Sequence, residues 1–185
     1  MKKFLLVLAC LLCMGALFAN PFEINLGLVG QCNSTLESTL ETQEFEFDFN
    51  DFSFGATAEA KLLLGEVNAT AFLTKVDDIN VLNGVLSGNL VLDLMMVRIG
   101  AGLGVNYLFD TENGFRFVGG DLLDANLSLR AEVDVLVKDL RVGLYATVPT
   151  RFTFSNIATF KYDEAELKDF WKAAVVGIAV KTNIF

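Results

Sequence analysis

Apolar and polar residues alternate at almost every position between Asp121 and Val148. From position 123 to 135 the odd-numbered residues are leucine, alanine or valine, and the even-numbered residues between them are polar or charged. A period of two is typical of a β-strand, because successive side chains point to opposite faces of a sheet. The alternation begins again after Lys138-Asp139 and continues through Leu144. This stretch therefore predicts a β-hairpin with one apolar face and one polar face.

The same alternation in the rest of the chain predicts eight strands in all. We expect them at about 21–32, 45–64, 67–76, 86–94, 99–109, 123–135, 142–154 and 170–185. The second strand loses its parity at Asn50-Asp51, which indicates a β-bulge. Short connections are predicted at Gly65-Glu66, 77–83, Met95–Val97 and Lys138-Asp139, and longer loops at 33–44, 110–120 and 155–169, with a short helix within 163–172.

Eight such strands predict an all-β fold, a closed eight-stranded antiparallel up-and-down β-barrel. The alternation alone does not show which face points inward, because a soluble barrel would place the apolar face inside and a transmembrane barrel would place it against lipid. The connections after strands two, four and six are short, and those after strands one, five and seven are long. Unequal rims with both termini on the short-turn side are typical of outer-membrane barrels, although the connection after strand three is a short exception.

The polar face also favours a transmembrane barrel. It contains glycines, which weaken an exposed strand surface but leave room for crowded side chains inside a narrow barrel, at Gly27, Gly55, Gly100, Gly102, Gly104 and Gly143. Charges of both signs share this face. We predict that they form a polar network in the lumen, consisting of Glu59, Lys61, Asp93, Arg98, Arg130, Glu132, Asp134 and Arg141. Such charges must be paired, because an unpaired charge in a poorly hydrated lumen costs several kcal/mol.

Aromatic residues on the apolar face gather where the long loops begin. If the odd-numbered strands rise from the side of the termini, these residues fall at one level of the barrel. Transmembrane barrels place such a circle of aromatic residues, called the aromatic girdle, at the membrane interface. The predicted girdle consists of Phe52, Phe54, Tyr107, Phe109, Phe152, Phe154 and Phe170.

The first nineteen residues have the pattern of a signal peptide. Lys2 and Lys3 form a positive n-region, an apolar core follows, and Ala19 precedes the predicted cleavage point. We therefore expect a leader at 1–19 and one barrel domain at 20–185. The segment ending in Cys10 loosely resembles a lipobox, but only about six apolar residues precede it, fewer than an h-region needs.

Composition narrows the function classes. Without Lys2 and Lys3 the chain keeps twelve basic residues against 23 acidic ones, so the mature net charge is −11 and nucleic acid is repelled. Only Cys32 remains after cleavage, which excludes an intramolecular disulfide. The chain is 53% hydrophobic with a mean hydropathy of +0.48, yet its mature part has no apolar run of about 18–20 residues for a transmembrane helix.

The chain contains no histidine. Its absence excludes Ser-His-Asp and Cys-His nucleophile activation and the usual imidazole base, so we predict no enzyme and no catalytic, cofactor-binding or metal-binding residues. The acidic stretch 33–51 is compatible with a divalent cation or a basic partner, but it lacks the spacing of an EF-hand loop. We interpret it as a solvated acidic loop. Glu132 and Asp134 are interpreted as part of the lumen network rather than as an acid-base pair.

The leader, the eight alternating strands, the unequal rims and the terminal Phe185 resemble the small bacterial outer-membrane barrels of the OmpA, OmpX and OmpW type. The segment Gly102 to Tyr107 is similar to part of the OmpW-like proteins. This resemblance implies a location in the outer membrane, contact with outer-membrane lipid, and recognition of Phe185 by periplasmic chaperones and the outer-membrane assembly machinery. The residues in step with Phe185 are Asn183 and Lys181, which departs from the apolar pattern usual in that group.

Three functional hypotheses remain open from the sequence. The first is a structural or surface-interaction barrel with a packed polar lumen, whose loops 33–44, 110–120 and 155–169 meet an extracellular partner. The second is a narrow, porin-like channel for small solutes, as the OmpW-like segment suggests. The third is a secreted, lipocalin-like ligand binder. An eight-stranded barrel is mostly filled by its own side chains, which favours the first hypothesis.

Overall fold

The computed structural model describes residues 20–35, 51–76, 79–111, 116–117, 125–153 and 170–185, and the account below concerns these residues. The predicted leader at 1–19 lies outside them, as do most of the three predicted long loops. The described part of the chain is almost entirely β-structure, with one short 3₁₀ helix, η3 (Phe170–Ala173). No helix in it has the length and apolar character needed to span a membrane.

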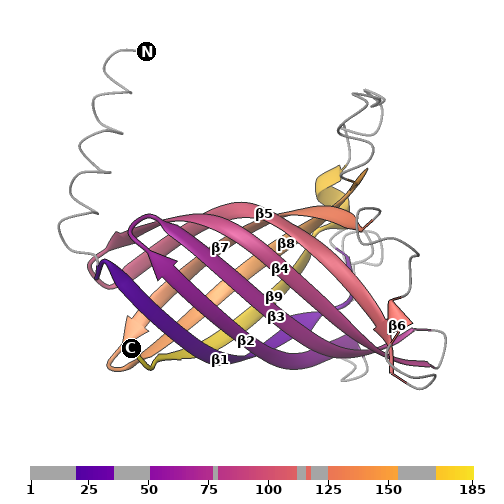
Figure 1. Cartoon of the computed structure of the whole chain (residues 1–185), viewed down its shortest axis with the longest axis horizontal. Helices are drawn as coiled ribbons and strands as arrows, with labels where there is room; N and C mark the ends of the chain where they lie inside the picture. Colours follow the sequence, from indigo (N-terminus) through magenta and orange to yellow (C-terminus); the bar gives the residue numbers. More distant parts are fainter. Residues whose placement is uncertain (1–19, 36–50, 77–78, 112–115, 118–124, 154–169) are drawn as a thin grey trace, which may run out of the picture.

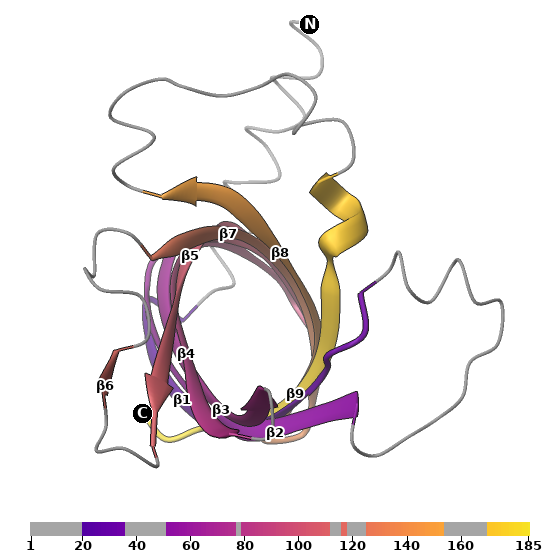
Figure 2. The ribbon, with the colours of Figure 1, turned by 90° about the vertical axis from the view of Figure 1, so that its right-hand side faces the viewer.

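Eight strands form a closed antiparallel barrel, as the alternation predicts. The strands are β1 (Phe22–Cys32), β2 (Phe52–Leu62), β3 (Gly65–Val76), β4 (Ile79–Leu94), β5 (Val97–Asp110), β7 (Asn126–Val137), β8 (Leu140–Thr153) and β9 (Val175–Asn183). Each strand pairs with the next along the chain, and β9 pairs with β1 to close the ring, which Figure 2 shows end-on. A two-residue strand, β6 (Arg116–Phe117), pairs only with the end of β5. The closed barrel leaves no exposed sheet edge along its paired length.

Three two-residue turns lie at one end of the barrel, at 63–64, 95–96 and 138–139. The first residue of each turn, Leu63, Met95 or Lys138, has a positive φ between 55° and 59°. The turns predicted around Met95 and Lys138 are confirmed. The turn predicted at Gly65-Glu66 is wrong, because Gly65 already pairs with Leu62 in the sheet. The chain reverses two residues earlier, at 63–64, where Leu63 has a left-handed conformation.

Both ends of the barrel chain lie at the same rim as these turns (Figure 1). Backbone hydrogen bonds join neighbouring segments there, from Ile24 N to Phe185 O at 3.1 Å and from Leu136 N to Met96 O at 2.7 Å. We call this end the short-turn rim. At the opposite rim the chain leaves β1, β5 and β8 into long connections, whereas β3 and β4 are joined through positions 77–78 alone.

Strand β4 is longer than the sequence predicts. It begins at Ile79, which pairs with Val76, so positions 79–83 belong to the strand and not to a connection. Asn80 and Asn83 interrupt the apolar alternation there, but the backbone pairing with β3 continues. Backbone pairing can therefore extend past the point where side-chain periodicity stops.

The start of β7 contains the irregularity in the pairing. The register between β7 and β8 shifts between Asn126 and Ser128, and the parity of burial changes with it: Leu127 is buried, whereas Leu129 and Val133 are exposed. A β-bulge produces this exchange of faces. The bulge predicted at Asn50-Asp51 involves a residue outside the described part of the chain.

The last strand is shorter than predicted. It begins at Val175 rather than near Phe170, because Phe170–Ala173 form η3, in which Ala174 N donates to Trp171 O at 3.1 Å. The predicted helix at 163–172 overlaps η3 in its last residues, and its remaining residues lie outside the described ranges.

Candidate functional site

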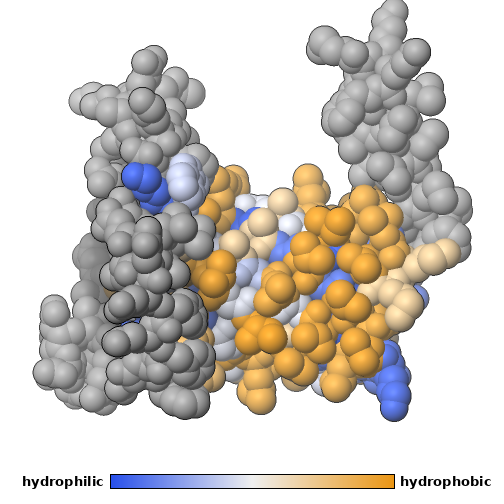
Figure 3. All heavy atoms as spheres, turned by 180° about the vertical axis from the view of Figure 1, so that it is seen from behind, coloured by the Kyte–Doolittle hydropathy of each residue, from blue (hydrophilic) through white to orange (hydrophobic). Residues whose placement is uncertain are grey.

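The barrel has an apolar exterior and a charged interior. Leucines on four different strands are largely exposed, and the outer surface carries a broad hydrophobic band (Figure 3). They are Leu28, Leu90, Leu103 and Leu144, with exposed fractions between 61% and 74%. In contrast, Arg98 is fully buried, and Lys61 and Glu59 are at most 2% exposed. This distribution of apolar and charged residues is the reverse of the usual one in water-soluble proteins, in which charged residues are rarely buried.

One ion-pair network lies next to the short-turn rim, centred on Arg98 at the start of β5. Its guanidinium donates to Asp93 Oδ1 at 2.6 Å through Nε and to Glu23 Oε2 at 2.5 Å through a terminal nitrogen. The other terminal nitrogen lies 3.4 Å from Glu66 Oε2. Arg141 on β8 donates to the same Glu23 oxygen at 3.0 Å. Four strands therefore meet through Arg98 and its carboxylate partners, and Arg141 adds a fifth, β8.

Lys61 completes this network on the side of β2. Its ammonium pairs with Asp93, and it lies 3.9 Å from Glu23 Oε1. Lys61 also donates to the backbone carbonyl of Asn20 at 3.1 Å. Both oxygens of the Asp93 carboxylate are thus paired with a cation, Oδ1 with Arg98 and Oδ2 with Lys61. Such multiple pairing is what makes charge burial tolerable.

A second network is centred on Lys181 in β9. Its ammonium lies 2.6 Å from Asp134 Oδ2, 2.7 Å from Glu59 Oε1 and 3.8 Å from Glu132 Oε1. Arg130 pairs with Glu132 Oε2 at 3.2 Å. The second network joins β2, β7 and β9 across the lumen.

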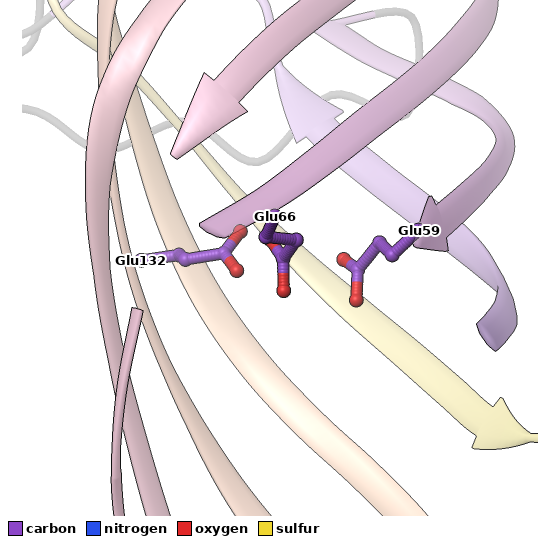
Figure 4. Close-up of side chains that lie close together, drawn as sticks. All are labelled: Glu59, Glu66 and Glu132. Carbon is purple, nitrogen blue, oxygen red and sulfur yellow. The ribbon is translucent and has the colours of Figure 1, made fainter. Parts of the chain in front are cut away.

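Three glutamates link the two networks. Carboxylate oxygens of Glu59, Glu66 and Glu132 lie within 4.8 Å of one another and point toward the middle of the barrel (Figure 4). Each already has a donor: Glu59 accepts from Lys181, Glu66 from Arg98, and Glu132 from Arg130. Amides of two asparagines contribute as well, Asn68 to Glu59 at 2.8 Å and Asn89 to Glu66 at 3.2 Å. The cluster is therefore the junction of the two ion-pair networks.

All eight residues predicted for the lumen network point into the barrel and join these pairs. Ten ionisable side chains of the two networks are buried, and Arg141 is half-buried. Three members were missed: Glu23, Glu66 and Lys181. Each lies on the polar parity of its strand, so alternation alone would have found them. The sequence prediction places Glu66 in a turn and names Lys181 only as a residue in step with Phe185.

Lumen-facing glycines make room for the charged side chains. A Cβ atom on Gly100 would lie 3.0 Å from Glu132 Cγ, and one on Gly27 would lie 2.7 Å from Lys181 Cγ. A Cβ on Gly143 would collide with the Asp134 carboxylate. A side chain at any of these positions would crowd a member of the Lys181 network.

The predicted aromatic girdle is described only in part. Phe52 and Phe54 stack with ring centroids 6.5 Å apart, and Tyr107 and Phe109 lie 6.5 Å apart, in both cases at strand ends away from the short-turn rim. Phe152 is half-buried near the end of β8. The side chains of Phe154 and Phe170 lie outside the described set. At the short-turn rim, the Phe185 ring packs edge-on against the Phe22 ring, with centroids 5.4 Å apart.

The candidate site is a set of buried ion pairs. Its charged groups are buried, fixed by partners on other strands, and drawn from carboxylates, guanidinium and ammonium groups. No protein-family model and no curated protein matches the chain. The interpretation of function therefore depends on the geometry of the barrel itself.

Proposed function

We propose that this chain is an integral outer-membrane β-barrel protein, exported with a cleaved leader, that acts as a structural or surface-interaction anchor and has no enzymatic activity. The observation that supports this proposal best is the apolar exterior around an ionic interior. Each leucine exposed to water rather than to an apolar surrounding forgoes about 1.5–3 kcal/mol. Four leucines on four strands are exposed by at least 61%, so an apolar surrounding stabilises this barrel strongly.

Backbone pairing supports the same location. A bilayer interior offers no hydrogen-bonding partner to an open strand edge, so only helices and closed barrels span it. The eight barrel strands form an unbroken ring of antiparallel pairs. They contain between 9 and 16 residues, and about 9–11 residues suffice for one tilted crossing. A soluble lipocalin-like barrel shares this closure, but it would bind its ligand in an apolar interior and not among ion pairs.

The filled interior favours an anchor over a channel. Buried charges on all sides of the lumen are paired across it, and neighbouring atoms occupy the space beside the lumen-facing glycines. An anchor of this kind leaves recognition to the surface loops. We propose that loops 33–44, 110–120 and 155–169 face the outside of the cell and meet an extracellular partner there.

Membrane association can be tested on native membranes and on the purified protein. We expect the mature chain to stay with outer-membrane fractions through carbonate extraction, and to float with liposomes after refolding. The folded barrel should also migrate differently from the boiled chain on a gel. Release into the carbonate supernatant together with failure to float would overturn the proposal and favour a soluble barrel.

A matched pair of variants makes this test specific to the outer face. Leu144→Asp introduces a charge on the apolar exterior, whereas Thr147→Asp introduces one on the polar, buried face of the same strand, opposite Arg130. We expect Leu144→Asp to lower the fraction that floats in folded form. A water-soluble barrel would instead tolerate Leu144→Asp and lose its fold with Thr147→Asp.

A further inference from the structure

The lumen contains an apolar layer besides its ionic networks. Five inward-facing residues from five strands pack together, each at most 6% exposed: Val29, Phe72, Val85, Tyr145 and Ala179. We call this set the apolar layer. Phe72 is the largest fully buried apolar side chain among the described residues, with 1% exposure. An apolar layer across a polar lumen has no role in neutralising charge, so it needs a separate explanation.

Relative to the short-turn rim, the apolar layer lies beyond most of the charged residues of the two networks. On four strands the charged residue comes first and the apolar residue follows farther along. Starting from that rim, the order is Glu23 then Val29 on β1, Glu66 then Phe72 on β3, Asp93 then Val85 on β4, and Arg141 then Tyr145 on β8. On these four strands the layer therefore lies between the charged residue and the rim where the long loops begin. On β7, Arg130 pairs in register with Thr147 and reaches the level of the layer.

A glycine makes room for the Tyr145 ring. A Cβ atom on Gly177 of β9 would collide with the Tyr145 ring, and one on Gly55 of β2 would collide with the backbone of β3 beside Phe72. The guanidinium of Arg130 stacks on the Tyr145 ring with its carbon 4.4 Å from the centroid. The contact between Arg130 and Tyr145 joins the apolar layer to the Lys181 network.

We propose that the apolar layer is the closure of the lumen, with Phe72 as its central element. Narrow hydrophobic constrictions exclude water and ions because a dehydrated ion gains no compensating contacts there. The ionic networks consist of polar groups that water can solvate, whereas the side chains of the apolar layer offer water few hydrogen-bonding partners. This inference rests on the proposed membrane location and adds that the wild-type barrel is sealed at one defined level.

The test compares two neighbouring residues that face opposite sides of the same strand. Phe72→Ala empties the centre of the apolar layer, whereas Leu73→Ala shortens a side chain on the outer face, where Leu73 is 67% exposed. Each purified protein is reconstituted in planar bilayers in potassium chloride. We expect stepwise openings from Phe72→Ala and only the bare-bilayer baseline from wild type and from Leu73→Ala.

A second variant keeps the test decisive if Phe72→Ala does not fold. Val85→Ser replaces the two methyl groups of Val85 with one hydroxyl in the apolar layer, and we expect smaller but clear openings from it. Gel mobility with and without boiling, and flotation with liposomes, identify the folded and inserted samples. Silent currents from folded, inserted Phe72→Ala or Val85→Ser would overturn the closure. Wild-type openings as large as those of the variants would overturn it too.

These outcomes are distinct from failure of the proposed function. A chain that folds but does not float with liposomes contradicts the membrane location itself, and with it the closure. A chain that floats, and whose layer variants stay silent, contradicts only the closure and leaves the anchor function in place.

Discussion

The outer face and the lumen of the same strands are held by different kinds of interaction. On β5, Leu103 is exposed to the surroundings with no partner of defined geometry, whereas Arg98 contacts three carboxylates from three other strands. Apolar burial is non-directional and roughly proportional to area. The strength of an ion pair in a confined space depends on the distance and orientation of the two charged groups. The exterior should therefore tolerate any apolar residue, and the lumen should tolerate few replacements of any kind.

The largest effect that distinguishes the two faces is expected at Arg98. Arg98→Met removes the charge that compensates Asp93, Glu23 and Glu66 together, and breaking a buried ion pair in this way costs about 3–5 kcal/mol. The measurement is urea unfolding in detergent or lipid, followed by the fluorescence of the single tryptophan, Trp171. Arg141→Met is the matched control, because Arg141 pairs with Glu23 alone in the described network and is half-buried. A larger loss from Arg141→Met than from Arg98→Met would contradict the network as described.

A charge on the exterior is expected to have the next largest effect. Leu103→Arg places a guanidinium on the outer face, where it would cost about 2–4 kcal/mol near the middle of a bilayer. Leu140→Arg makes the same change beside the 138–139 turn, where the cost in a membrane falls to about 0–1 kcal/mol. The two unfolding free energies are compared in the same lipid. Equal, near-zero effects at both positions would show that the outer face meets water.

The smallest effect compares two glycines on opposite faces. A Cβ on Gly27 would meet the backbone of β9, at 2.5 Å from Val180 O, whereas a Cβ on Gly88 would meet nothing within 4 Å. Overpacking of this kind costs about 1–3 kcal/mol, so Gly27→Ala should be clearly destabilising. Gly88→Ala should be neutral or stabilising by about 0.4–1 kcal/mol, because it reduces the freedom of the unfolded chain. Similar unfolding free energies for both variants would show that the lumen has unfilled space.

Much of the barrel follows from the period-two pattern alone. Alternation predicts the number of barrel strands, their antiparallel order and the turns that follow Leu94 and Val137, because each strand has one apolar and one polar face over most of its length. The turn predicted at 95–97 is one residue shorter in the structure, because Val97 already pairs with Leu94. The same parity places Arg98, Glu132 and Asp134 on one surface. The parity of a residue within its strand predicts on which face its side chain lies, so the inward-facing residues can be predicted without knowing how the strands pair.

The errors occur where backbone pairing and side-chain pattern separate. Strand β4 starts at Ile79 because its backbone stays paired through Asn80 and Asn83, although the apolar alternation has stopped. The turn before β3 uses Leu63 in a left-handed conformation and not Gly65, which carries the usual turn signal. Ion-pair partners were also out of reach, because Lys181 and Glu59 are 122 residues apart and meet only through the closure of β9 onto β1.

The measurement that tests the central claim most directly is the environment of single spin labels on the two faces and at a turn. In a Cys32→Ser background, cysteines replace Leu103 on the outer face and Lys138 in the 138–139 turn, and each labelled barrel is reconstituted in lipid. The account predicts that the label at 103 collides with oxygen, which concentrates in the bilayer, and is shielded from a water-soluble nickel chelate, while the label at 138 shows the opposite preference. Equal access of the nickel chelate to both labels would contradict a lipid-facing exterior.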